Sequence, residues 1–125
     1  MPEAILIVDD EQGVLDNLAT YLEDEDLVVY TARSGEEAIR RIDAGLNVQI
    51  CIVDLRLRGM SGIETIVKIR NLAPQTHFII HTGSEDKSVA TVLQRVGLDN
   101  LPVFRKPLTN MSALVSKLQA YYDHK

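Results

Sequence analysis

The sequence of 125 residues predicts an α/β domain built around a parallel β-sheet. Short apolar runs rich in branched residues recur along the chain, as expected of strands that are covered on both faces. Between these runs, apolar residues recur every three or four positions, which is the spacing of amphipathic helices. Five strands that alternate with five helices predict a doubly wound sheet with right-handed crossovers.

The strands are predicted at residues 5–8, 27–31, 50–53, 77–81 and 103–105. Ser34 and Glu37 form a capping-box pattern at the start of the second helix, and Gly45 is expected to end that helix. Pro102 places the last strand at an edge of the sheet, because proline cannot donate a ladder hydrogen bond. The apolar stripes of the five helices lie within residues 14–22, 38–42, 63–70, 89–96 and 111–118.

Composition narrows the class of protein. Hydrophobic residues make up 46% and charged residues 25%, a balance typical of one globular domain. No apolar run approaches the roughly 18 residues of a membrane span, and the first residues do not resemble a secretory signal. A single cysteine, Cys51, lies in an apolar strand, so we expect a buried, inert thiol in a reducing cytoplasm. The formal charge of −5 argues against direct binding of nucleic acid.

Polar residues follow four of the predicted strands directly: Asp9, Asp10, Asp54, Thr82 and Lys106. In a parallel sheet these strand ends lie at one edge, where α/β proteins bind ligands. Three crowded carboxylates favour a cation, and hard oxygen ligands suit Mg²⁺. A lysine and a hydroxyl would then bind phosphoryl oxygens, and a carboxylate can be the nucleophile. Helix capping explains any one acid alone, whereas the whole set predicts a phosphoacceptor site.

Four motifs resemble those of the receiver domain of two-component response regulators, over essentially the whole chain. They are Ile5–Glu11, Ile52–Arg56 followed by Gly59–Gly62, Thr82-Gly83 and Lys106-Pro107. Each motif alone is weak, but together in this order and spacing they are specific. The resemblance implies a flavodoxin-like sheet of order 2-1-3-4-5, as in the family's chemotaxis member. It also implies that residues 1–125 form one receiver domain.

The resemblance implies a role for each matching residue. Asp54 would be phosphorylated, Asp10 would bind Mg²⁺ directly, and Asp9 would bind it directly or through water. The backbone carbonyl of Arg56 would complete the protein ligands of the ion, to which Asp54 also contributes.

The remaining two motifs concern the phosphoryl group itself. Lys106 would pair with a phosphoryl oxygen, and Thr82 would reach towards the phosphoryl group in the active state. The family often has a cis peptide at the position of Lys106-Pro107. The donor would be a phosphohistidine on a sensor kinase or a phosphotransfer protein, and the phosphorylated surface would bind an output protein or domain of unknown identity.

The sequence departs from the family pattern in three places. Val103 stands where the family usually carries its switch aromatic, and strand alternation points the neighbouring Phe104 to the other face. This leaves the loops and the fourth helix to carry the signal. Residues 97–102 replace a small Ala/Gly-rich turn, and Arg58 replaces a common proline without a consequence that the sequence reveals.

Several alternatives stay open. The domain could be a phosphorelay shuttle that passes the group to another histidine, or a phosphorylation-independent interaction module. A turnover hydrolase is disfavoured, because only Arg56 or Ser84 is positioned to influence an attacking water. His77 and His81 share a strand face, and a metal or proton role for His81 competes with plain burial. Arg56 and Arg58 either tune access to Asp54 or are solvated loop charges.

Overall fold

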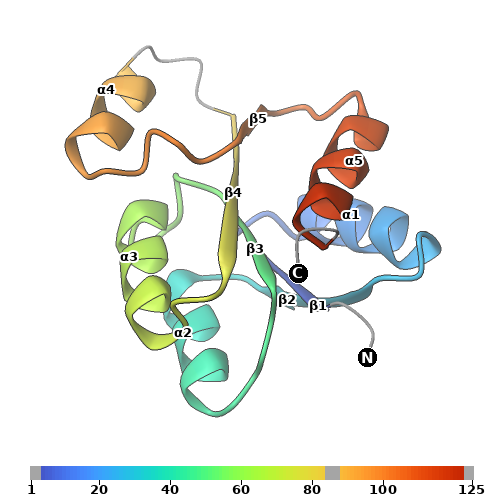
Figure 1. Ribbon diagram of the computed structural model, residues 1–125, viewed down its shortest axis with the longest axis horizontal. Coiled ribbons are helices and arrows are strands. Elements are labelled where there is room, and N and C mark those ends of the chain that lie inside the picture. The colour runs from blue at the N-terminus through green and yellow to red at the C-terminus, as the bar shows by residue number, and fades with distance from the viewer. Residues whose placement is uncertain (1–3, 84–87, 123–125) are drawn as a thin grey trace.

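The structure is a computed structural model that describes residues 4–83 and 88–122. Ser84, one of the two residues predicted to influence an attacking water, lies outside the described residues. It contains one parallel sheet of five strands in the order β2-β1-β3-β4-β5, which confirms the predicted topology (Figure 1). The strands are β1 (Ala4–Val8), β2 (Val28–Ala32), β3 (Ile50–Val53), β4 (His77–Thr82) and β5 (Val103–Arg105).

Helices cover both faces of this sheet. Figure 1 shows α1 and α5 on one side, and α2 and α3 on the other, with α4 near the β5 edge. A buried apolar cluster lies under each layer, as expected of strands that read as continuous apolar runs. The helices are α1 (Gln12–Asp24), α2 (Gly35–Asp43), α3 (Gly62–Leu72), α4 (Ser88–Arg95) and α5 (Met111–Tyr122).

Strand alternation divides the side chains between the two clusters. In β1, Ile5 and Ile7 pack under α1 and α5, whereas Leu6 and Val8 pack against the opposite layer. Cys51 is completely buried in the same cluster as Leu6 and Val8, and burial raises the pKa of its thiol to about 12. The thiol is therefore protonated and inert at neutral pH, as predicted.

Two strand boundaries differ from the prediction. β2 lies one residue further along the chain, because Val28 rather than Leu27 pairs with the first residue of β1. β4 extends through Thr82, whose carbonyl accepts the N–H of Lys106 at 2.9 Å. Both differences arise from pairing with a neighbouring strand, which local periodicity does not contain.

Side chains cap two of the helices. The Oγ of Ser34 accepts the N–H of Glu37 at 3.1 Å, as predicted for α2. The Glu37 carboxylate reaches back to the N–H of Arg33 at 2.9 Å rather than to that of Ser34, so the reciprocal bond lies one residue earlier. At α3, Ser61 accepts the N–H of Glu64 at 3.1 Å in the same way. None of the described helices has both the length and the apolarity needed to cross a bilayer.

Candidate functional site

The carboxyl edge of the sheet brings residues from three strands into contact. The Nζ atom of Lys106, just after β5, lies 2.8 Å from Asp9 Oδ2 and 2.9 Å from Asp54 Oδ2. The Asp9 and Asp54 side chains, after β1 and β3, are only 2% and 5% exposed. Thr82, at the end of β4, is also buried. Lys106 therefore bridges two buried carboxylates that would otherwise repel each other.

Strand register explains why these side chains converge. Val8 pairs with Val53, so the next residues, Asp9 and Asp54, are also neighbours across the sheet. Ile7 and Ile52, two residues before them, belong to the cluster under α1 and α5. Because alternate residues of a strand point the same way, both aspartates are on the α1/α5 face.

The backbone around Asp54 is held from several directions. Its N–H donates to the carbonyl of Val8 at 3.0 Å, and its Oδ1 accepts the N–H of Arg56 at 3.1 Å. Gly62, the first residue of α3, packs directly on this backbone. A Cβ atom at Gly62 would overlap the carbonyl oxygen of Asp54 and lie 2.6 Å from the Cα of Leu55. The glycine thus allows α3 to begin against the acceptor loop.

Four acids form an oxygen cluster: Asp9, Asp10, Glu11 and Asp54 each offer an atom within 4.8 Å of the others. Hard oxygen donors around a partly open site suit Mg²⁺, so the residues present fit this ion. Glu11 was not among the predicted site residues, although its place beside the acidic pair was a signal. Its Oε1 lies 3.6 Å from Lys106 Nζ.

Burial and ion pairing act together on the protonation of the site. Burial raises the pKa of Asp9, and hydrogen bonds from Lys106 and from the N–H of Glu11 oppose that rise without cancelling it. Burial alone would lower the pKa of Lys106. The hydrogen bonds and charges of Asp9 and Asp54 outweigh burial, so the pKa of Lys106 is raised and the ammonium stays charged at physiological pH.

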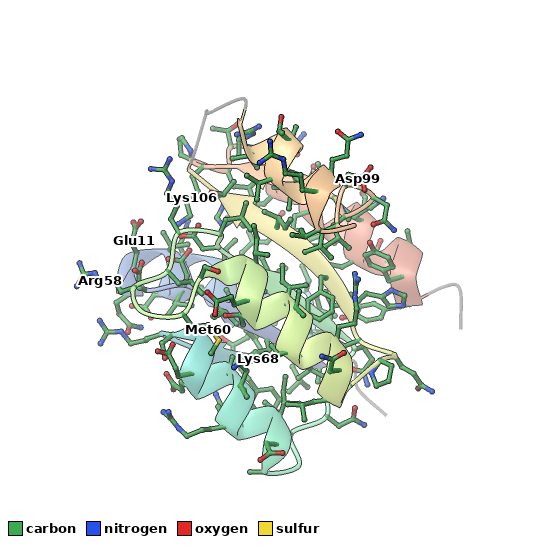
Figure 2. All side chains as sticks on the ribbon, turned by 90° about the vertical axis from the view of Figure 1, so that its left-hand side faces the viewer. Glu11, Arg58, Met60, Lys68, Asp99 and Lys106 are labelled. Carbon is green, nitrogen blue, oxygen red and sulfur yellow. The ribbon has the colours of Figure 1, made fainter. Side chains whose placement is uncertain are left out.

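The two arginines of the β3–α3 loop lie differently. Arg56 contributes its backbone N–H to Asp54. Arg58 contacts Asp10 instead: its N–H lies 3.2 Å and its Nε 3.9 Å from Asp10 Oδ2. Its side chain is 95% exposed, and Figure 2 shows it projecting from the same rim of the molecule as Glu11. Of the two arginines predicted either to tune access to Asp54 or to be solvated loop charges, Arg56 thus contacts Asp54 through its backbone and Arg58 contacts Asp10.

The two histidines of β4 have different surroundings. His77 is exposed and stacks on Tyr121 of α5, with ring centroids 4.4 Å apart. His81 is buried, and its ring nitrogens have no hydrogen-bond partner among the described residues. Burial, followed by the charge of Lys106, lowers the pKa of His81 to about 4, so the ring is neutral at pH 7. His81 is not part of the oxygen cluster, which gives no support to a metal role.

The residues near the usual switch position lie as predicted. Phe104 packs with the cluster under α1 and α5, whereas Val103 lies on the α4 side and is 36% exposed. Val103 lines a hollow of about 280 Å³ with residues of α4 and β5 and with Asp99. The peptide bond between Lys106 and Pro107 is cis, which confirms the expectation from the family.

Comparison with known proteins identifies the family. The family model of the response regulator receiver domain matches residues 5–119. The chain belongs to this family. Regulatory protein VanR of Enterococcus faecium is 32% identical over 124 residues, which are 97% of this chain and 52% of VanR. A cyclic di-GMP phosphodiesterase of Thermotoga maritima is 30% identical over 114 residues, covering 91% of this chain and 29% of that protein.

Solved structures agree with this receiver assignment. A CheY-like receiver domain from Methanospirillum hungatei is 25% identical with a TM-score of 0.84, covering 98% of this chain and 96% of that one. Response regulator protein TrrA from Thermotoga maritima, in complex with Mg²⁺-BeF, is 27% identical with a TM-score of 0.81, covering 95% and 98%. The family is a phosphoacceptor switch that interacts with histidine kinases. The chain spans about half or less of the length of its curated relatives VanR and the phosphodiesterase.

Proposed function

We propose that residues 1–125 form one phosphoacceptor domain, in which Asp54 receives a phosphoryl group from a phosphohistidine of a sensor kinase or phosphotransfer protein. The observation that carries this proposal is the bridge from Lys106 to the buried carboxylates of Asp9 and Asp54. A permanently charged lysine beside an acceptor carboxylate can neutralise an incoming phosphoryl oxygen. The phosphorylated domain then presents an altered surface to a protein partner, in the cytoplasm.

The oxygen cluster supports a metal role for three acids. In this proposal Asp9, Asp10 and Asp54, with the backbone carbonyl of Arg56, hold Mg²⁺. When bound, the ion supplies charge neutralisation for these carboxylates and for the oxygens of the phosphoryl group. Since Asp9 and Asp54 are already paired with Lys106, the chain can keep both carboxylates buried before the ion arrives.

The transfer needs little covalent work from other side chains. A carboxylate oxygen of Asp54 attacks phosphorus as the P–N bond of the donor breaks. The leaving imidazole, protonated on its other nitrogen, keeps the bonding electron pair and departs neutral. Lys106 exchanges one of its carboxylate contacts for a phosphoryl oxygen, and the hydroxyl of Thr82 donates to another. The product is an acyl phosphate on Asp54, and the domain is an acceptor rather than a turnover enzyme.

Intact-mass spectrometry tests this proposal. The protein is incubated with acetyl phosphate and Mg²⁺, with Asp54→Asn alongside and with EDTA replacing Mg²⁺ in a third sample. We expect one added phosphoryl group only in the wild-type sample that contains Mg²⁺. If neither acetyl phosphate nor a phosphohistidine donor adds mass, the proposal is wrong and the domain is an interaction module. Unchanged partner binding by Asp54→Asn would point to the same module.

A relay shuttle is a second candidate, favoured by Val103. An intermediate that passes its phosphoryl group to another histidine needs no aromatic switch, and Val103 provides none. Mixing the phosphorylated domain with a histidine phosphotransfer domain separates the two functions. Rapid loss of label to the phosphotransfer domain supports the shuttle, whereas stable label and stronger binding to an output partner support the switch.

A further inference from the structure

Arg58 contacts Asp10, the most accessible of the three acids proposed as Mg²⁺ ligands. Asp9 and Asp54 are nearly inaccessible and paired with Lys106, whereas the Asp10 side chain is 20% exposed. Both contacts of Arg58, from its backbone N–H and from its guanidinium, converge on the same atom, Asp10 Oδ2. The β3–α3 loop therefore binds one carboxylate oxygen of Asp10, which is a member of the oxygen cluster.

The position of this loop is fixed from its other side as well. The N–H of Met60 points to Glu36 Oε2 at 3.4 Å, and a Cβ atom at Gly59 would lie 2.7 Å from the same oxygen. Glu36 belongs to the first turn of α2. The loop that carries Arg58 is therefore packed against α2, and this packing places Arg58 beside Asp10.

We propose that Arg58 sets the Mg²⁺ affinity of the site by competing with the ion for Asp10. This inference rests on the proposed function, in which Asp10 is a metal ligand. Arg58 is a positioning residue: it acts through Asp10 and does not contact the phosphoryl group. In this proposal the ion takes Asp10 Oδ2 from the N–H of Arg58, and it brings a divalent charge close to a guanidinium.

The guanidinium and the backbone N–H of Arg58 oppose Mg²⁺ binding in different ways. The guanidinium is 95% exposed, so its attraction to Asp10 is weak. Its repulsion of a divalent ion is twice that of a monovalent one at the same distance, although water screens it strongly. The N–H bond to a carboxylate is charge-assisted, and a proline at this position could not make it. A proline therefore removes both contacts, whereas alanine or glutamine removes the charge alone.

Mg²⁺ titrations of metal-free protein, followed by amide NMR, separate these contributions. We expect Arg58→Ala and Arg58→Gln to bind Mg²⁺ about three- to tenfold more tightly than wild type, which follows from removing a screened unit charge. Arg58→Pro should bind at least as tightly as Arg58→Ala. In the wild type, the amide signal of residue 58 should shift along the same binding curve, because its bond to Asp10 is released. Arg70→Ala, which removes an exposed charge from α3, is the matched control and should bind like wild type.

The outcomes distinguish this inference from the proposed function. Equal affinities in wild type, Arg58→Ala and Arg58→Gln would overturn the inference, as would weaker binding by both variants. An unmoved amide of residue 58 would show that the N–H contact does not oppose the ion. No Mg²⁺ binding by wild type, together with no phosphorylation of Asp54, would overturn the proposed function itself.

Discussion

Among single side chains, Lys106 matters most to the balance of charge in the site. Its ammonium is 13% exposed and lies within 2.9 Å of two buried carboxylates. Lys106→Met should destabilise the metal-free domain by about 3 kcal/mol, because it leaves two buried charges without a counter-ion. Urea unfolding in EDTA at pH 7 measures this loss. Lys68→Met, which removes an exposed lysine from α3, should change stability by less than about 0.5 kcal/mol.

Lowering the pH should reduce the difference in the free energy of unfolding between Lys106→Met and wild type. The pKa of Asp9 is already raised by burial, and loss of the lysine raises it further. A carboxyl group with a raised pKa binds its proton more readily in the folded state, so protonation favours folding as the pH falls. A difference that stays constant between pH 7 and pH 5 would contradict a burial effect at Asp9.

His81 gives a pH dependence of the opposite sign. Its pKa is about 4 in the folded protein against an ordinary value of 6.5, so the unfolded chain binds more protons between these values. Stability should therefore fall as the pH drops from 6.5 to 4, by up to about 3 kcal/mol from this residue. Urea unfolding at several pH values in this range should show that the free energy of unfolding changes less with pH in His81→Leu than in wild type.

Much of the residue-level site could be predicted because its members follow strands directly. Asp9, Asp54 and Lys106 come together because a parallel sheet aligns its carboxyl ends, and that alignment follows from the apolar runs before them. The contact of Arg58 with Asp10 could not be predicted. It joins residues 48 positions apart through a loop conformation that no periodic pattern encodes. The His81 ring, whose nitrogens find no hydrogen-bond partner within residues 4–83 and 88–122, likewise depends on the side chains that pack over it.

At the level of elements, the start of α3 controls the acceptor loop. Gly62→Ala should destabilise the domain by at least about 3 kcal/mol, because its Cβ atom would overlap backbone that cannot move aside. Gly13→Ala is the contrasting control: nothing lies within 4 Å of its added Cβ atom in α1. It should stabilise the domain by about 0.5–1 kcal/mol. Equal effects of the two substitutions in urea unfolding would show that α3 can shift away from Asp54.

Element type was easier to predict than element boundary. Each helix is marked by a stripe of apolar residues and each strand by a branched run, so local pattern indicated all ten elements. Boundaries depended on partners: β2 is displaced by its register with β1, and β4 gains Thr82 through its pairing with residues after β5. The edge position of β5 was predictable from Pro102, because that residue has no N–H for a ladder.

For the molecule as a whole, Mg²⁺ should act as a stabilising ligand. An ion that binds only the folded state raises the free energy of unfolding by about 2.7 kcal/mol at 100 times its dissociation constant. We expect the midpoint of thermal unfolding to rise with Mg²⁺ and to return with EDTA. Asp10→Asn should lose most of this rise, whereas Asp24→Asn at the exposed end of α1 should keep it. An equal rise in both variants would place the binding ion elsewhere.

The order of the strands along the chain has a consequence for synthesis on the ribosome. The acids follow β1 and β3, whereas Lys106 follows β5, which comes later in the chain. A nascent chain therefore exposes all of its clustered negative charge before the balancing lysine has emerged. The first three strands cannot bury Asp9 and Asp54 without cost at that stage, so their final docking should wait for β5. A translation pause before residue 106 would prolong the interval in which the nascent chain is open to proteases and chaperones.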